Sequence, residues 1–212
     1  MKKYTILLFI SVILITCNKN DEIAPQEKNF YALSVGNSWV YKNYEYNSSL
    51  DDYEYLGITD SVSIIDTEII KGEIYYKFRR MTIGNEKRNT FCNVNGEHIS
   101  FLRDSLGFLI NNQGLIKYAN NNFDERQAFV VSPNIIAYEK LLKETKIIDT
   151  EAGSFESLIT KRYARQTDNG KIAPSLDYRY YSDAIGLVSD TQSYLTSNRH
   201  FVIRRLDSFS IK

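Results

Sequence analysis

The chain has 212 residues, in which 26 lysines and arginines balance 26 aspartates and glutamates. Residues 1–16 hold two lysines and no acid, so the rest of the chain carries a net charge near −2. This balance argues against nucleic acid as a partner, because binding phosphates requires a basic face. The length suits one domain. The abundance of tyrosine (16) and the scarcity of proline (3) favour strands over disorder.

The N-terminal segment has the features of a secretion signal. Two lysines precede an apolar run of ten residues, Ile6 to Ile15, which contains a single serine. A membrane-spanning helix needs about 20 apolar residues, so this run has the length of a signal-peptide core instead. The run ends directly before Thr16 and Cys17. We therefore interpret residues 1–16 as a signal peptide and Cys17 as the first residue of the mature chain.

The four residues Leu14-Ile15-Thr16-Cys17 resemble the bacterial lipoprotein signal box, an aliphatic residue and two short residues before an obligatory cysteine. The resemblance implies lipidation at Cys17, which would make the membrane a partner of this protein. Each buried lipid CH₂ contributes about 0.8 kcal/mol, so several acyl chains form a lasting anchor. The alternative is an ordinary cleaved signal peptide followed by an incidental cysteine.

Residues 17–28 form the predicted lipidated cysteine and flexible tether, because the segment after Cys17 is polar. Within it, Lys19-Asn20-Asp21-Glu22 resembles the acidic signal that directs lipoproteins of one group of Gram-negative bacteria to the cell surface. The alternative is a solvated linker. We expect an outer membrane lipoprotein, on either the periplasmic face or the cell surface.

Residues 29–212 are predicted to form one antiparallel β domain. A turn at Gly36-Asn37 feeds a strand in which Trp39 and Tyr41 share one face. Further strands are expected at residues 61–70, 73–80, 86–94, 98–103, 107–110, 115–119, 155–166, 176–182, 187–195 and 201–209. The expected turns are Lys71-Gly72, Asn95-Gly96, Asn112-Gln113-Gly114 and Asp168-Asn169-Gly170.

One segment carries a different pattern. Pro133 to Lys143 has Ile135, Tyr138 and Leu141 at helical spacing, which is compatible with a short helix or with an extended edge segment. The predicted fold is therefore all-β, with at most one short helix. Its single antiparallel sheet is strongly curved, as a half-barrel or barrel.

Three stretches resemble motifs of small β-rich bacterial lipoproteins of the Bacteroidetes type, which in turn resemble lipoprotein-carrier-like half-barrels. These stretches are Phe30 to Tyr41 with its Val-Gly-Asn-x-Trp-x-Tyr sequence, Ile147 to Ser157 with Ala-Gly-Ser-Phe, and Tyr180 to Val188 with Gly-Leu-Val. The resemblance implies a curved sheet with an apolar concave side and no particular activity. Ala152-Gly153 and Gly186 are interpreted as bends or bulges that curve the sheet.

Side chains that could support chemistry are few. With Cys17 lipidated, Cys92 has no disulfide partner, and we expect it to be a small, buried and inert residue in a strand. His98 and His200 lie far apart in sequence, so a zinc site with Cys92 would require the fold to unite them. Asp51-Asp52, with Asn47 and Glu54 nearby, lacks the glycine of a calcium loop and suits a hairpin tip.

Two three-residue stretches, Asp60-Ser61-Val62 and Asp104-Ser105-Leu106, resemble an O-glycosylation signal of exported bacterial proteins. The alternative is that they are strand and turn residues. The sequence contains neither of two common cofactor motifs, the phosphate loop and the dinucleotide fingerprint. It also lacks the Gly-x-Ser-x-Gly motif of serine hydrolases.

The favoured function is a non-enzymatic binding or scaffolding lipoprotein, whose partner is an apolar ligand or an envelope protein. One alternative is a secreted glycan hydrolase that uses two unidentified carboxylates. Another is a passive structural component of the envelope. An open apolar concavity would favour binding, an acid-lined cleft would favour hydrolysis, and a filled core would favour the structural role.

Overall fold

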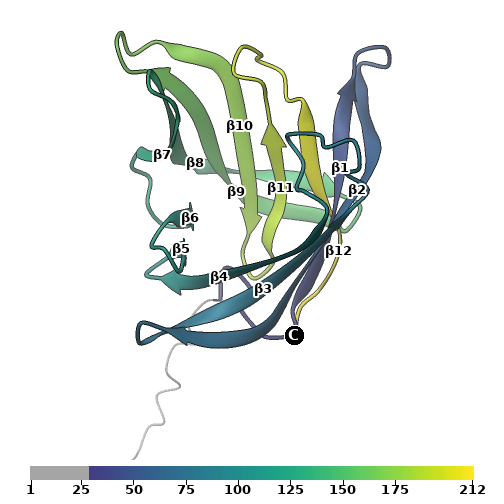
Figure 1. Ribbon diagram of the computed structural model, residues 1–212, viewed down its shortest axis with the longest axis vertical. Coiled ribbons are helices and arrows are strands. Elements are labelled where there is room, and N and C mark those ends of the chain that lie inside the picture. Colours follow the sequence, from purple (N-terminus) through teal and green to yellow (C-terminus); the bar gives the residue numbers. More distant parts are fainter. Residues whose placement is uncertain (1–28) are drawn as a thin grey trace, which may run out of the picture.

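The computed structural model describes residues 29–212, which form a single antiparallel sheet and contain no helix (Figure 1). Cys17, the predicted signal peptide and the predicted tether lie outside these residues. No helix in the described part of the chain is long and apolar enough to cross a membrane. The twelve strands of residues 29–212 are β1 (Ser38–Asn47), β2 (Asp52–Ile70), β3 (Glu73–Ile83), β4 (Gly96–Ser105), β5 (Phe108–Asn111), β6 (Ile116–Ala119), β7 (Arg126–Ser132), β8 (Ile135–Thr150), β9 (Gly153–Gln166), β10 (Ile172–Ser182), β11 (Gly186–Gln192) and β12 (Val202–Ser210).

The sheet consists of two meanders joined by the pairing of the first strand with the last. Its order is β6-β5-β4-β3-β2-β1-β12-β11-β10-β9-β8-β7, and every paired neighbour is antiparallel. The strands curve around a central space, so the sheet is nearly closed into a barrel (Figure 1). The prediction of an all-β fold with one strongly curved antiparallel sheet is confirmed.

The barrel has one seam, between the edge strands β6 and β7. These strands are adjacent in sequence but are not hydrogen-bonded as neighbours in the sheet. Arginine side chains bridge the seam instead: Arg179 Nη1 donates to the carbonyl of Lys117 at 2.8 Å, and Arg126 Nη1 donates to that of Ile116 at 3.4 Å. Both guanidinium groups also bind the carboxylate of Glu139 on β8, at 3.2 and 2.5 Å. A buried acid therefore positions the two side chains that link β6 to the strands on the other side of the seam.

The apolar core fills one end of the barrel. The segment before β1 contributes four consecutive buried residues, Phe30 to Leu33, which pack against inward-facing residues of the sheet. Among the latter are Trp39, Tyr118 and Leu206, exposed by 4%, 0% and 0% of their surfaces. Trp39, which shares a face of its strand with Tyr41, is thus part of the buried core.

The expected turns are mostly correct. Lys71-Gly72 joins β2 to β3 with both residues at positive φ, and residues 112–114 and 168–170 join β5 to β6 and β9 to β10. Gly36 also has a positive φ, of 96°, at the turn that enters β1. Because side chains with a Cβ are strained at such angles, these positions favour Gly, Asn or similar residues.

The hairpin expected at Asn95-Gly96 is wrong. Residues 84–95 form a long connection, and β4 pairs with β3 instead of with a strand at 86–94. Asn85 organises this connection, because its side-chain amide donates to the carbonyls of Asn89 and Asn93 and its oxygen accepts from the Asn89 N–H. These local bonds satisfy the backbone that a strand would otherwise pair.

Two further expectations need correction. The helix considered for 133–143 is absent: Pro133 and Asn134 form the β7–β8 turn, and Ile135 begins β8. Ala152-Gly153 is not a bulge, because Glu151 and Ala152 form the tight β8–β9 turn between Thr150 and Gly153. Gly186 follows the β10–β11 turn and starts β11. The bulges that curve the sheet lie elsewhere, for example at Val40/Tyr41 and Ile64/Asp66.

Candidate ligand-binding cavity

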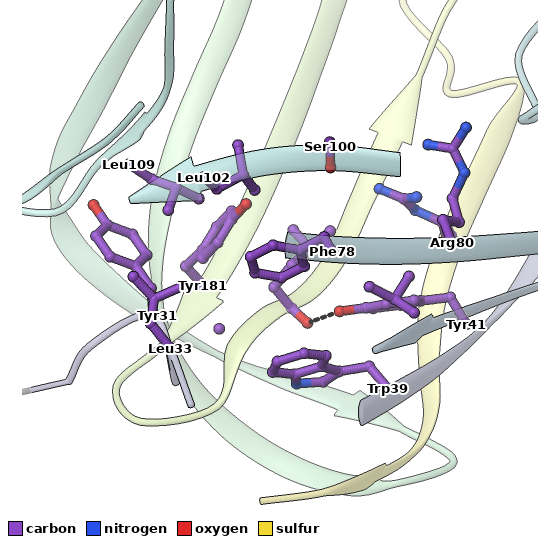
Figure 2. A pocket seen from close by; sticks show the side chains of 14 residues that line it. Tyr31, Leu33, Trp39, Tyr41, Phe78, Arg80, Ser100, Leu102, Leu109 and Tyr181 are labelled. Atoms are coloured by element: carbon purple, nitrogen blue, oxygen red, sulfur yellow. Dashed lines mark hydrogen bonds between the residues drawn. The ribbon is translucent and has the colours of Figure 1, made fainter. Parts of the chain in front are cut away.

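A cavity of about 180 Å³ lies inside the barrel beside the apolar core. Its walls are mainly aromatic and aliphatic, and Figure 2 shows Trp39 and Tyr41 on one side of it, Tyr31 and Leu109 on the other, and Phe78 and Tyr181 between them. The full lining comprises Tyr31, Leu33, Trp39, Tyr41, Val62, Phe78, Arg80, Ser100, Leu102, Leu109, Tyr181, Gly186, Leu187 and Arg204. Protein interiors are normally close-packed, and an empty apolar cavity lowers the stability of the fold. A cavity of this size is therefore a candidate binding site.

Two motifs that are distant in sequence build the aromatic wall. Trp39 Nε1 donates to the carbonyl of Ile185 at 2.8 Å, and Tyr41 Oη donates to that of Leu187 at 2.9 Å. Both acceptors belong to the stretch around Gly186, 146 residues further along the chain. The polar atoms of Trp39 and Tyr41 thus bind the backbone of residues 185 and 187, and their apolar faces line the cavity. Burial raises the pKa of Tyr41 far above its ordinary value, so the phenol stays neutral.

A polar layer lies next to the apolar chamber. Arg204 forms a two-point ion pair with Asp190, at 2.8 Å for both bonds, and lies 3.7 Å from Asp60. Asp60 has no exposed surface and accepts hydrogen bonds from Thr82 Oγ1 at 2.5 Å and Asn93 Nδ2 at 3.0 Å. Burial alone would lower the pKa of Arg204, but the two carboxylates raise it above its ordinary value. The charges of this layer are therefore paired and hydrogen-bonded, as burial requires.

Arg80 is the exception in this layer. Its guanidinium lies at the edge of the cavity, and within residues 29–212 it has no carboxylate within 4.0 Å. Its Nε atom is buried and has no hydrogen-bond partner. Burial lowers the pKa of Arg80, which the more distant Asp60 opposes.

A second cavity, of about 260 Å³, lies between β7–β10 and the 84–95 connection. Among its lining residues are Asp177 and Ser193, and His200 lies close by. Ser193 Oγ donates directly to Asp177 Oδ1 at 2.6 Å, while His200 Nδ1 is 3.3 Å from Ser193 Oγ. In a Ser-His-Asp triad the imidazole stands between the serine and the acid. Here the serine hydroxyl donates its hydrogen bond to the acid directly, so the arrangement lacks that geometry.

The structure does not unite the residues considered for a metal. His98 Nε2 lies 3.0 Å from the carbonyl of Val94, whereas His200 packs edge-on against Tyr178. Within residues 29–212, no group of three His, Cys, Asp or Glu side chains could hold a metal ion. Asp51 and Asp52 lie at the β1–β2 turn, as expected for a hairpin tip.

Cys92 lies in the connection between β3 and β4, and the expectation of a strand position is wrong. Its side chain is half-buried, less than expected. Burial and the nearby carboxylates of Asp60 and Glu45 raise the pKa of its thiol to about 11. The two candidate glycosylation stretches, residues 60–62 and 104–106, lie within β2 and at the β4–β5 turn.

Sequence reasoning missed the polar layer. Arg204 lies between Val202 and Leu206, which are 1% and 0% exposed, so all three share the inward face of β12. The alternation of Val, Arg and Leu was the one signal for an inward arginine. Nothing comparable pointed to Asp60 or Arg80, whose strands alternate less regularly.

Comparisons with protein-family models and with curated proteins find no match. Two solved structures are similar to this chain. One is described as a "putative lipoprotein" from Parabacteroides distasonis ATCC 8503, with a TM-score of 0.52 and 15% identity. The other is a "putative exported protein with YmcC-like fold" from Bacteroides fragilis NCTC 9343, with a TM-score of 0.55 and 12% identity. Each match covers 86% of this chain and 99% of the other.

At these identities the likeness shows a shared fold. The resemblance to β-rich lipoproteins of the Bacteroidetes, drawn above from three sequence motifs, is therefore confirmed for the architecture.

Proposed function

We propose that this protein is a lipid-anchored envelope lipoprotein whose barrel binds an apolar ligand without chemical turnover. The observation that carries the proposal is the cavity of about 180 Å³ beside Trp39, Phe78 and Leu102. Concave, mostly apolar sites with a few polar groups are typical of small-molecule binding. An apolar cavity of about 150 Å³ is large enough to take up benzene, so this one accommodates a ring or a short chain.

The chemistry of the cavity favours binding over the hydrolase alternative. Asp60 and Asp190, the two carboxylates that interact with the lining residue Arg204, are engaged by Arg204, Thr82 and Asn93. The wall itself is lined by aromatic and aliphatic side chains and two arginines. A glycosidase needs one protonated acid and one free carboxylate facing the substrate. A passive structural component would be expected to have a filled interior, whereas this barrel contains a cavity.

Titration with 1-octanol tests the binding proposal. The mature chain is purified without detergent as the Cys17→Ser variant, and binding is followed by calorimetry and by Trp39 emission. Trp39 is the single tryptophan and lines the cavity, so its emission reports on the occupancy. We expect saturable binding of one molecule, because burying an octyl chain stabilises the complex by up to about 0.8 kcal/mol per CH₂.

A matched pair of variants locates the ligand. Ser100 and Ile99 are neighbours on β4 and both are exposed, but only Ser100 lines the cavity. Ser100→Phe should fill the space and abolish octanol binding, whereas Ile99→Phe, on the opposite face, should leave it unchanged. Binding that survives Ser100→Phe, or no binding to the parent chain, would refute the proposal.

The anchor is part of the same proposal. Lipidation of Cys17 at an outer membrane, on the periplasmic face or the cell surface, is supported by the apolar run that ends at this cysteine. Fractionation of cells that express the full chain or its Cys17→Ser variant tests it. The variant should leave the membrane fraction, and equally firm membrane association of both chains would contradict the anchor.

A further inference from the structure

We propose that the ligand is an amphiphile with a single anionic head group, a carboxylate or another oxyanion, that binds Arg80 while its apolar part occupies the aromatic chamber. This inference rests on the proposed function and specifies its ligand class. Among the charged side chains that line the cavity, Arg80 has no counterion within residues 29–212.

Two arginines line the cavity, and their surroundings differ. Arg204 is held by Asp190 through two bonds of 2.8 Å and lies 3.7 Å from Asp60. Asp60 in turn accepts hydrogen bonds from Asn43, Thr82 and Asn93. Neither acid lies within 4.0 Å of Arg80. The positive charge of Arg80 is thus the one at this cavity without a direct counterion in the described residues.

The polar atoms of Arg80 are also under-used. A guanidinium has five N–H donors in a planar fork, and burying one without a partner costs free energy. The Nε of Arg80 is buried without a hydrogen-bond partner in residues 29–212. A carboxylate or similar oxyanion offers two acceptor oxygens in the geometry that matches this fork. An anion at Arg80 would therefore supply both the missing charge and the missing acceptor.

The position of Arg80 divides the cavity into a head end and a tail end. Figure 2 shows Arg80 on the side opposite to Tyr31 and Leu109, with Phe78 and Tyr181 between them. Arg80 and Phe78 follow one another on the inward face of β3, as residues two apart on a strand do. A linear amphiphile lying along this direction would place its charged group at Arg80 and its chain among the aromatic rings.

Three probes with the same octyl chain test the head group: octanoate, 1-octanol and octylammonium. Each is titrated into the detergent-free Cys17→Ser chain at neutral pH, with Trp39 emission and calorimetry as readouts. A charge-assisted hydrogen bond contributes about 1.5–3 kcal/mol, or roughly a tenfold or larger change in affinity. We expect octanoate to bind about tenfold or more tightly than octanol, and octylammonium to bind weakest.

Variants of the adjacent residues Arg79 and Arg80 test whether Arg80 causes the preference for octanoate over octanol. Arg80→Gln should lower octanoate affinity about tenfold and leave octanol affinity unchanged. Arg79→Gln is the matched control, because Arg79 is exposed on the opposite face of β3. Arg80→Lys keeps the charge without the fork and should retain part of the preference. Thermal melts of all variants check that each is folded. The relative affinities of the three probes for the parent chain test the head group without any substitution.

The outcomes separate the two proposals. If octanol binds the parent chain as tightly as octanoate, the anionic head group is wrong and the apolar binding function stands. If Arg80→Gln weakens octanol and octanoate equally, Arg80 has a structural role and the inference is overturned. If none of the three probes binds, the proposed function itself fails.

Discussion

Trp39 belongs to both the core and the cavity wall, and it links β1 to the β10–β11 turn. Its indole is 4% exposed, stacks on Phe78 with ring centroids 6.3 Å apart, and donates its N–H to Ile185. The side chain therefore contributes packing and one long-range hydrogen bond at the same time. Loss of it would enlarge the cavity and leave the Ile185 carbonyl without this donor.

Trp39→Ala should lower the free energy of unfolding by about 3–5 kcal/mol, because a large buried side chain is removed. Trp39→Phe is the control, since it keeps most of the apolar surface and should cost less. Urea unfolding followed by circular dichroism measures both, because neither variant retains the tryptophan. Equal midpoints for the parent chain and Trp39→Ala would contradict this account of the core.

Cys92 should react slowly with thiol reagents at neutral pH. Its thiol has a pKa raised to about 11 by burial and by Asp60 and Glu45, so the reactive thiolate is scarce at pH 7. In the Cys17→Ser chain, the labelling rate of Cys92 should rise about tenfold per pH unit until the pH nears 11, as expected for a thiolate-dependent reaction. Denaturant should speed labelling at pH 7, and a folded chain that labels rapidly with a plateau below pH 9 would refute the prediction.

At the scale of elements, turn chemistry was the part of the fold that the sequence could predict. Lys71-Gly72 and the 112–114 and 168–170 segments give correct hairpins because each contains a glycine, Gly72, Gly114 or Gly170, that adopts the positive φ such turns need. Asn95-Gly96 is also a typical turn dipeptide, but here it ends the long 84–95 connection and does not form a two-residue hairpin. The amide of Asn85 closes the 84–95 connection on itself, and no local pattern shows which backbone that amide will bind.

Strand β8 shows why periodicity failed for residues 133–143. Leu141 is buried inside the barrel, whereas Tyr138 lies on the outer face, where it stacks on Tyr163 and under Arg165. Apolar side chains on both faces of a strand imitate helical spacing. Charged residues also lie on the inner face, where Glu139 and Arg162 pair at 2.5 Å. Such partners come from different strands and cannot be read from local sequence.

The seam between β6 and β7 should depend on Glu139. This acid is 2% exposed and binds Arg126, Arg162 and Arg179. Glu139→Gln leaves three guanidinium groups together without their counterion and should lower the free energy of unfolding by about 3–5 kcal/mol. Glu125→Gln removes a half-exposed pair with Arg165 and should cost at most about 1 kcal/mol. Similar losses in both variants, measured by urea unfolding, would contradict the role of Glu139.

The difference in unfolding free energy between the parent chain and Glu139→Gln should depend on pH. Burial alone would raise the pKa of Glu139, but Arg179, Arg162 and Arg126 hold it below its ordinary value. A carboxylate with a depressed pKa contributes stability that is complete above its unfolded pKa, near 4.3, and is lost as the pH falls through the folded value. The stability difference between the parent chain and Glu139→Gln should be constant above about pH 6 and shrink below about pH 4. A difference that grows on acidification would show that Glu139 is not held as the anion.

At the scale of the whole molecule, the barrel combines an apolar chamber, a layer of paired charges and a seam held by arginines. The chamber lies where the segment before β1 meets β3, β4 and the β10–β11 turn, so strands from both meanders form its wall. Because β1 pairs with β12, the two meanders form one continuous sheet around this space, and the edges of this sheet are β6 and β7. We therefore propose this interior as the place where the ligand binds.

Mass spectrometry of the full chain purified from its own membrane tests this claim most directly. Molecules held without a covalent bond are extracted with organic solvent from the parent chain, Ser100→Phe and Ile99→Phe, prepared in parallel. We predict a defined anionic amphiphile in stoichiometric amount in the parent chain and Ile99→Phe, and its depletion in Ser100→Phe. The same extract from all three chains, or no small molecule from any of them, would contradict the account.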